Sequence, residues 1–236
     1  MQKIMGYLRR AVEEYQMLAN GDVVAVGVSG GKDSVALLAG LAGARRFLGV
    51  DFRLEAITLD NCFDGVETDF TPIRQLCDRL EVPYTLRRTD IGKIIFQDRG
   101  ESNPCSLCAR MRRGLLHDQA KALGCNKIAL GHHYDDAVDT FIMNLFNEGR
   151  IGCFQPVSYL SRKDLTMIRP LLFAPERELR NAVARAGLPV VKSRCPVDGC
   201  TERQWTKEFL AGLERTHPGL TKRIFGAMRP AHVSGW

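Results

Sequence analysis

Two kinds of apolar pattern alternate along the first three quarters of the chain. Short apolar runs that end at glycine or polar positions predict strands, and longer runs with helical spacing predict helices. The expected strands are Val23–Val28, Arg53–Leu59, Tyr84–Arg88 and Lys127–Leu130, with a shorter one near Met167–Arg169. The expected helices between them are Ser34–Leu48, Glu67–Leu80, Leu107–Leu123 and Asp135–Glu148.

This alternation predicts one fold class. Strand–helix–strand units with right-handed crossovers build an α/β protein with a parallel, doubly wound sheet. After Pro170 the pattern is helical only, with helices expected at Pro175–Ala186, Thr201–Leu213 and Leu220–Met228. We therefore divide the chain into an N-terminal helix (1–20), an α/β domain (21–174) and a helical C-terminal extension (175–236).

The composition indicates a cellular compartment and a class of binding partner. The chain has 236 residues, of which 45% are hydrophobic, and a formal net charge of +6. No apolar stretch approaches the roughly 20 residues that cross a bilayer, and the charged N-terminal helix does not have the pattern of a secretory signal. We expect a cytoplasmic protein with no membrane partner, whose eight cysteines are reduced thiols. The positive charge is compatible with a nucleic-acid partner.

Residues Ser29–Ser34, with the sequence SGGKDS, are the strongest candidate for chemistry. They lie directly after an expected strand and directly before an expected helix, where backbone N–H groups and the helix dipole favour a phosphate. Gly30 and Gly31 let the backbone approach the phosphate closely, and Lys32 supplies a positive charge. The common phosphate-binding loop needs a hydroxyl after its lysine, where this chain has Asp33. The motif therefore predicts a polyphosphate site of another kind.

A second motif, Gly131–Asp136 with the sequence GHHYDD, follows the fourth expected strand. Because ligands of parallel sheets bind beyond the carboxyl ends of the strands, this motif and the glycine-rich loop should face one cleft. Asp135 and Asp136 could hold a Mg²⁺ that bridges ATP phosphates, or could cap the helix that follows. We place His132 in the cleft and treat His133 as a packing residue.

Four cysteines form the candidate metal-binding set. Cys105 and Cys108 open an expected helix, where a thiol pKa is commonly depressed and where both sulfurs can reach one metal. Cys195 and Cys200 follow much later in the chain. Four thiolates would suit a structural zinc, whereas three would suit an iron–sulfur cluster with one open iron. The remaining cysteines are single residues, expected to fill the core except for Cys62 near the cleft: Cys62, Cys77, Cys125 and Cys153.

Together these motifs resemble a known family. The loop Ser29–Ser34 is similar to the signature of the PP-loop ATP pyrophosphatases, which cleave ATP between the α- and β-phosphates. The chain also has Cys105-x-x-Cys108 before an arginine-rich run, the segment Lys127–Asp136, and a late cysteine before Arg203-Gln204. In this combination it closely resembles the tRNA 2-thiocytidine synthetases over about residues 20–230.

The resemblance implies an enzyme with the adenine nucleotide alpha-hydrolase-like fold that uses ATP, Mg²⁺ and a [4Fe-4S] cluster on three cysteines. Such an enzyme adenylates the C2 carbonyl of cytidine-32 in tRNA and replaces its oxygen with sulfur delivered through the cluster from a cysteine desulfurase or another donor. A homodimer is also implied. Two alternatives remain open: another PP-loop tRNA-modifying enzyme of the thiouridine or lysidine type, and a zinc-stabilised nucleotide-binding protein without turnover.

The site residues that the resemblance implies form two groups. The expected catalytic residues, of which the three cysteines are also the metal ligands, are Lys32, Asp33, Cys105, Cys108 and Cys195. The residues expected to bind the nucleotide and its Mg²⁺ are Ser29, Gly30, Gly31, Lys32, Asp33, Ser34, Gly131, His132, Asp135 and Asp136. We prefer Cys195 to Cys200 as the third ligand because a residue before proline is held extended, which fixes its sulfur.

Overall fold

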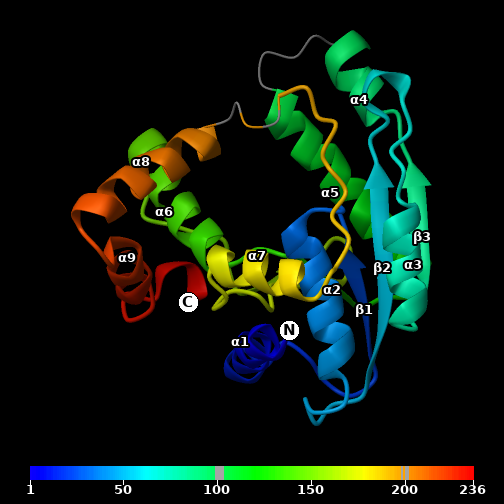
Figure 1. Cartoon of the computed structure of the whole chain (residues 1–236), viewed down its shortest axis with the longest axis horizontal. Coiled ribbons are helices and arrows are strands. Elements are labelled where there is room, and N and C mark those ends of the chain that lie inside the picture. Colours follow the sequence, from blue (N-terminus) through cyan, green and yellow to red (C-terminus); the bar gives the residue numbers. More distant parts are fainter. Residues whose placement is uncertain (99–103, 198, 200–201) are drawn as a thin grey trace.

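The computed structural model describes residues 1–98, 104–197, 199 and 202–236. Its centre is a six-stranded sheet with the order β3-β2-β1-β4-β6-β5 (Figure 1). Neighbouring strands pair in parallel except for β5, which pairs antiparallel with β6. The strands are β1 Asp22–Gly27, β2 Phe52–Asp60, β3 Tyr84–Arg88, β4 Lys127–Ala129, β5 Val157–Leu160 and β6 Leu165–Ile168.

Helices connect the parallel strands and form the two ends of the chain. They are α1 Gln2–Glu14, α2 Lys32–Ala44, α3 Thr71–Arg79, α4 Ile91–Lys93, α5 Pro104–Ala122, α6 Tyr134–Glu148, α7 Glu176–Arg185, α8 Glu202–Thr216 and α9 Leu220–Met228. Each strand that was expected from the sequence is present. The helices α6 and α9 match their expected ranges closely.

Alternating side chains of the strands fill two separate cores. Val24 and Val26 of β1 belong to the larger cluster, which contains the buried residues of α1, α2 and α7. Ala25, between them, belongs to a smaller cluster with Ile128 of β4 and Ala120 of α5. Because side chains of a strand alternate between its faces, helices must cover both faces of the sheet. This is the doubly wound α/β class that the sequence predicts.

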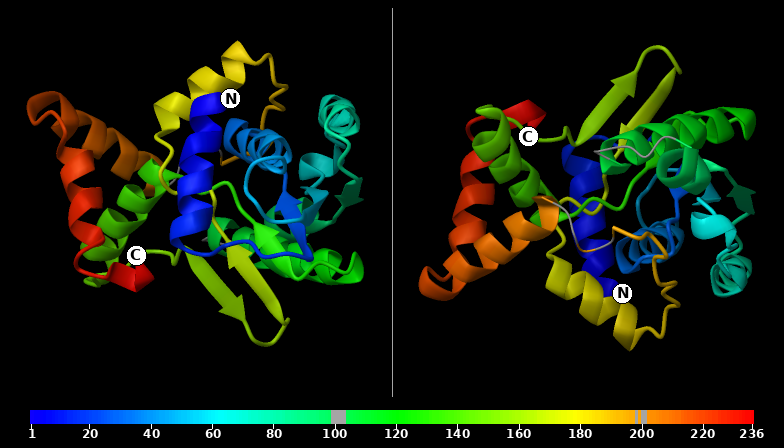
Figure 2. Two further views of the ribbon diagram at one scale, coloured as in Figure 1. Left: turned by 90° about the horizontal axis from the view of Figure 1, so that it is seen from below. Right: turned by 90° about the horizontal axis from the view of Figure 1, so that it is seen from above.

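Two details differ from the expectation of a wholly parallel sheet. The antiparallel strand β5 was not predicted, because Ser158 and Tyr159 interrupt its apolar run and Tyr159 is exposed. The hairpin of β5 and β6 extends from one side of the molecule (Figure 2). Helix α3 begins at Thr71 rather than at Glu67, since Pro72 suits the first turn of a helix and disfavours helical backbone before it.

The C-terminal extension contacts the rest of the chain through several helices. Helix α7 packs against α2, while α8 and α9 pack against α6 (Figure 1). The last residue, Trp236, contacts the rings of Phe154 and Phe225 and donates its Nε1 hydrogen bond to the Phe154 carbonyl at 2.8 Å. Since α1, the sheet and the extension share one apolar cluster, the domain division at residues 21 and 175 stays a prediction. Within the described ranges, no helix has the length and apolar character needed to cross a membrane.

We predict that Gly131→Ala distorts the start of α2. A Cβ at Gly131 would lie 3.1 Å from the backbone carbon of Asp33 and 3.2 Å from the backbone nitrogen of Ser34. Since backbone must move to admit it, the free energy of unfolding should fall by about 1–3 kcal/mol, measured by urea denaturation. The control is Gly226→Ala, where nothing lies within 4 Å of the added Cβ in α9. A stability of Gly131→Ala equal to that of this control would contradict the tight contact.

Candidate functional site: adjoining nucleotide and cysteine cavities

The glycine-rich loop turns sharply between β1 and α2. Gly30 has a φ of +86°, and a Cβ added there would lie 2.9 Å from the Cβ of Val191. The Ser34 hydroxyl donates to the Gly31 carbonyl at 2.8 Å, which holds the turn closed. Among the described residues no side chain caps the N-terminus of α2. The first N–H groups of α2 are therefore available to an anionic ligand.

A cavity of about 340 Å³ opens beside this loop. Its walls include Ser29 and Asp33 of the loop and Gly131 and His132 after β4. Both motifs therefore face one cleft at the carboxyl ends of the parallel strands, as predicted. Its apolar lining comes from Val28, Ile57, Leu59, Leu116 and Leu130. A cavity with an apolar wall beside a phosphate-binding turn suits the base and phosphates of a nucleotide.

Acidic side chains gather around His133 at the start of α6. The His133 backbone N–H donates to Asp136 Oδ2 at 3.0 Å, and the His133 side chain accepts from the Asp136 backbone, so that the pair caps the helix. The His133 Nε2 also lies 3.8 Å from Asp33 Oδ1. Asp33 Oδ1 is buried and has no hydrogen-bond partner within the described chain. Asp136 therefore caps the helix, whereas the cavity lining in the described chain contains neither Asp135 nor Asp136. His133, which we treated as a packing residue, links the two motifs.

Lys32 is held by two carboxylates. Its Nζ lies 2.9 Å from Asp33 Oδ2 and 2.8 Å from Glu176 Oε1. Burial opposes the charged amine, but the hydrogen bonds to Glu176 and Asp33 raise the pKa of Lys32 overall. Burial would also raise the pKa of Glu176, yet the hydrogen bond and charge of Lys32 lower it to about 2. Both groups are therefore charged at neutral pH. The lysine amine lies between a carboxylate of α2 and a carboxylate of α7.

Two residues that the sequence did not identify as nucleotide-site residues contact the side chains of the two motifs. Glu176 begins α7, and its backbone N–H donates to Asp135 Oδ2 at 2.6 Å. Arg203 of α8 pairs with Asp136 Oδ1 at 3.0 Å. These contacts join residues that are 41 and 67 positions apart in the sequence. The spacing of residues within a short motif gives no information about such contacts. The sequence carried one signal for Glu176, since an acidic residue directly after a proline is typical of the first turn of a helix.

His132 lies between the nucleotide cavity and the C-terminal aromatic residues. Its ring is 4.9 Å from the ring of Phe154, centroid to centroid. Burial, followed by the charge of Arg169, lowers the pKa of His132 to about 4. The imidazole is therefore neutral at physiological pH. Its Nδ1 is buried without a hydrogen-bond partner among the described residues.

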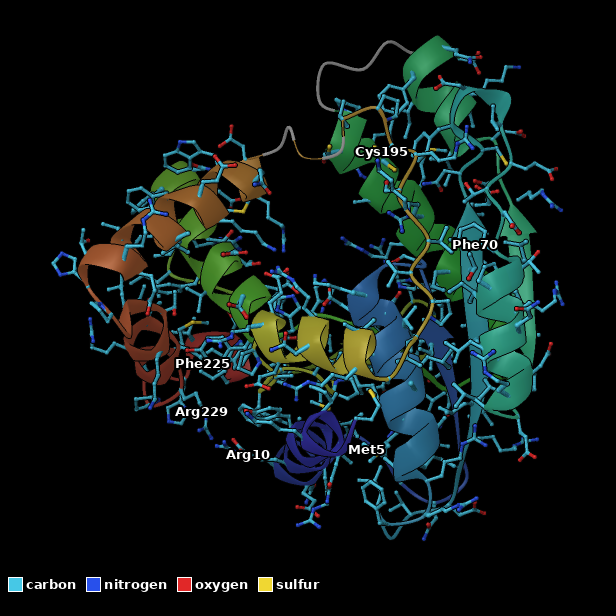
Figure 3. The ribbon with its side chains drawn as sticks, viewed as in Figure 1. Met5, Arg10, Phe70, Cys195, Phe225 and Arg229 are labelled. Carbon is cyan, nitrogen blue, oxygen red and sulfur yellow. The ribbon has the colours of Figure 1, made fainter. Side chains whose placement is uncertain are left out.

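A second cavity, of about 390 Å³, brings three cysteines together. Cys105 and Cys108 come from the first turns of α5, and Cys195 comes from the segment that follows α7. Figure 3 shows Cys195 beside the N-terminal part of α5. The same cavity is lined by the cationic residues Arg112, Arg203 and Lys207. Cys200, the alternative third ligand, lies outside the described residues.

The expected depression of the Cys105 and Cys108 pKa values is wrong for the chain without a metal. Burial, followed by the nearby Cys195, raises the pKa of Cys105. Burial also raises the pKa of Cys108, although Arg112 acts in the opposite direction. Desolvation and a like charge therefore outweigh the helix dipole. In the described ranges, no three His, Cys, Asp or Glu side chains already surround a point that could hold a single metal ion.

Two of the four other cysteines are fully buried. Cys77 and Cys125 are buried, and burial raises the pKa of each thiol to about 11. Cys153 is half-buried and donates a hydrogen bond to the Ala137 carbonyl. Cys62 is half-buried directly after β2, with a φ of 45°. None of these four lines the cysteine cavity in the described part of the chain.

The two cavities adjoin along α5. Ala109 and Arg112 line both the nucleotide cavity and the cysteine cavity. The fold and this site define a nucleotide-binding α/β protein whose phosphate-binding loop lies next to a set of thiols.

Comparison with known proteins agrees with this class. The family model of the PP-loop domain matches residues 6–209. The tRNA-cytidine(32) 2-sulfurtransferase of Pelobacter propionicus is 38% identical over 226 residues, which cover 94% of this chain and 83% of that protein. The enzyme of the same name from Geobacter sulfurreducens is 37% identical, with 98% and 91% covered. The chain belongs to the PP-loop tRNA 2-thiocytidine synthetase family.

A solved structure agrees with this placement. The U34-tRNA thiolase NcsA from Methanococcus maripaludis, with its [4Fe-4S] cluster, superimposes with a TM-score of 0.78 at 25% identity. The match covers 97% of this chain and 78% of that one. The α/β architecture and the helical extension therefore both have a counterpart in a solved thiolase.

We predict that a buried carboxyl in α6 makes stability depend on pH. Burial raises the pKa of Asp139 to about 7, and Lys207 opposes this shift. The folded chain therefore keeps a proton that the unfolded chain releases near pH 4, so stability falls as the pH rises from about 4 to about 7. Relative to the wild type, Asp139→Asn should gain free energy of unfolding over that range, by at most about 1.4 kcal/mol per pH unit.

Urea denaturation of both proteins at pH 5, 6 and 7 measures this difference. The decisive result is the sign of the change with pH. Asp139→Asn should become more stable relative to the wild type as the pH rises, because its amide cannot lose a proton in the folded or the unfolded state. Curves that stay parallel across the range would contradict the raised pKa of Asp139.

Proposed function

We propose that this protein catalyses ATP-dependent thiolation of tRNA at cytidine-32. The observation that carries the proposal is the shared wall of the two cavities, in which Ala109 and Arg112 separate a nucleotide site from three cysteines. The names of the curated relatives support tRNA as the substrate and thiolation of cytidine as the reaction. In the proposed reaction the C2 carbonyl oxygen of the base attacks the α-phosphorus of ATP, and pyrophosphate leaves. A sulfur nucleophile then adds to C2, and AMP leaves with the oxygen.

The glycine-rich loop would bind the phosphates. The N–H groups at the start of α2 are the donors, and the hydroxyls of Ser29 and Ser34 would exchange their hydrogen bonds within the loop for bonds to the phosphates. Lys32 supplies the charge that balances the departing pyrophosphate. Mg²⁺ fits beside Asp33 and Asp136, because Asp33 Oδ1 is buried and unpaired within the described chain. The ion would supply further positive charge at the phosphates. Holding base and ATP in one cleft can contribute about 7–11 kcal/mol to lowering the barrier.

Cys105, Cys108 and Cys195 would hold a [4Fe-4S] cluster. Their sulfurs face one cavity, and Arg112 and Lys207 in its wall would balance the negative charge of thiolate ligands. The cluster in the NcsA structure supports this assignment. With three protein ligands, such a cluster keeps one iron open to an exogenous sulfur ligand. The protein's own contribution is to place that sulfur next to the nucleotide cavity.

The substrate tRNA would approach across cationic residues near the two cavities, of which Arg112 lines both. A base in a single-stranded loop leaves its stack at low cost, which suits an anticodon-loop target. The candidate phosphate contacts are Arg110, Arg112, Arg113, Lys192, Arg194, Arg203 and Lys207. A cysteine desulfurase or another donor would supply the sulfur, in the cytoplasm. A homodimer stays a prediction from the family resemblance.

Turnover with tRNA and ATP under anaerobic conditions tests the reaction. We expect AMP and pyrophosphate as products and 2-thiocytidine in the nucleoside mass spectrum of the tRNA. Lys32→Ala should lower this turnover about a hundredfold or more, because it removes the charge that balances the leaving group. The control is Lys163→Ala, an exposed lysine that pairs with Asp118. Release of ADP and orthophosphate would exclude the proposed cleavage, and lysidine in the spectrum would support the alternative reaction.

Substitution of single cysteines tests the ligand set. After anaerobic reconstitution, Cys105→Ser, Cys108→Ser and Cys195→Ser should each lose the broad iron–sulfur absorbance and the thiolation activity. Cys200→Ser should keep most of both, as should the control Cys62→Ser. If Cys200→Ser loses the cluster and Cys195→Ser keeps it, the third ligand is Cys200. Loss of metal in all four variants, with one zinc per chain in the wild type, would instead indicate the zinc-stabilised alternative.

A further inference from the structure

Glu176 occupies a central position in the charge network of the nucleotide site. Its Oε1 contacts Lys32 Nζ at 2.8 Å, and its Oε2 lies 3.5 Å from Lys207 Nζ. Its own backbone is fixed by the hydrogen bond to Asp135. The carboxylate of Glu176 thus connects α7 with α2 and α8, and its backbone connects α7 with α6. In Figure 1, α7 lies alongside the N-terminal part of α2.

The contact with Lys32 conflicts with phosphate binding. Lys32 begins the helix whose open N-terminus faces the phosphates, and it is the loop's own cation. Its amine makes two short contacts, both with carboxylates of the protein. An ATP or pyrophosphate anion that takes this amine competes for it with both carboxylates, since like charges around one cation repel.

Glu176 can release Lys32 without becoming an unpaired charge. Arg180 Nη2, one turn further along α7, lies 3.4 Å from its Oε1, and Lys207 remains near its Oε2. A buried carboxylate that loses its partner costs much more than one that keeps a second cation. The exchange of Lys32 between Glu176 and a phosphate is therefore inexpensive in either direction.

We propose that Glu176 is a positioning residue that competes with pyrophosphate for Lys32 and so promotes pyrophosphate release. The inference rests on the proposed cleavage of ATP to AMP and pyrophosphate. While pyrophosphate is bound, Lys32 faces the phosphates, and Glu176 keeps Lys207 and Arg180. As pyrophosphate leaves, Glu176 takes back the amine and restores the pair seen in the structure.

Isothermal titration of the full chain with inorganic pyrophosphate tests the competition directly. Glu176→Gln keeps the shape of the side chain and removes its charge, so pyrophosphate should bind about fivefold more tightly or better. In steady-state turnover the same variant should lower both kcat and the KM for ATP. The matched control is Glu178→Gln, since Glu178 lies on the same helix and pairs at 2.7 Å with Lys3, away from the loop. Its affinity for pyrophosphate should equal that of the wild type.

A double-mutant cycle separates competition from a general loss of negative charge. In a Lys32→Gln background, Glu176→Gln should change pyrophosphate affinity by less than about twofold, because the contested amine is absent. An equal gain in both backgrounds would overturn the proposal, and so would unchanged affinity in Glu176→Gln. If Glu176→Gln does not fold by circular dichroism, Glu176→Asp, which is one methylene shorter, should give a smaller gain in the same direction, and no gain would overturn the proposal. Release of ADP and orthophosphate in turnover would instead refute the proposed ATP cleavage, on which the inference rests.

Discussion

The approach of one backbone segment to another determines the geometry of both cavities. Val191, between α7 and α8, donates its N–H to the Gly30 carbonyl at 2.9 Å. Since any Cβ on Gly30 would collide with Val191, this contact exists only with glycine in the loop. Four residues further along, Cys195 reaches the cavity that Cys105 and Cys108 line. The phosphate-binding turn is thus also the anchor that places the third thiol.

Electrostatic compensation is the second requirement of the site. Asp33, Asp135 and Asp136 each have a carboxylate oxygen within 3.8 Å of the His133 ring, and Glu176 donates its backbone N–H to Asp135. The loop contributes one cation, whereas Arg203 and Lys207 come from α8. The acidic cleft therefore depends on the C-terminal extension as much as on the sheet. Detaching α8 would remove a cation from each of two half-buried carboxylates, Asp136 and Glu176, which links the folding of the extension to the integrity of the cleft.

Local patterns in the sequence accounted for most of the fold. Val23–Val28 and Tyr84–Arg88 are predictable as strands because apolar and β-branched runs end at turn residues, and both strands are present. The strand β5 escaped prediction since an exposed edge strand needs no apolar run. The end of α2 was placed too late, at Leu48 instead of Ala44. Apolar residues continue past the last helical turn there, so their pattern does not mark the end of the helix.

The site was predictable where its residues share a motif and, for Cys195, where the family resemblance pointed to a late cysteine. Ser29–Ser34 is one short motif, and the pair Cys105 and Cys108 is another. Each motif allowed us to predict residues that line one of the two cavities. The roles of His133, Glu176 and Arg203 depend on contacts across the fold. A single sequence carries no signal for such pairs. The pKa of a thiol is likewise a property of burial and neighbours, which is why the helix-start rule failed for Cys105 and Cys108.

The helical geometry of α5 sets the distance between the two cavities. Cys108, Arg112 and Leu116 are spaced by four residues and share one face of the helix. Cys108 lines the cysteine cavity, Leu116 lines the nucleotide cavity, and Arg112 lines both. At 1.5 Å per residue the two ends of this row are about 12 Å apart. That separation is set by helix pitch rather than by the conformation of a loop. One inserted residue would rotate the thiols by about 100° away from the nucleotide while leaving both motifs intact in sequence.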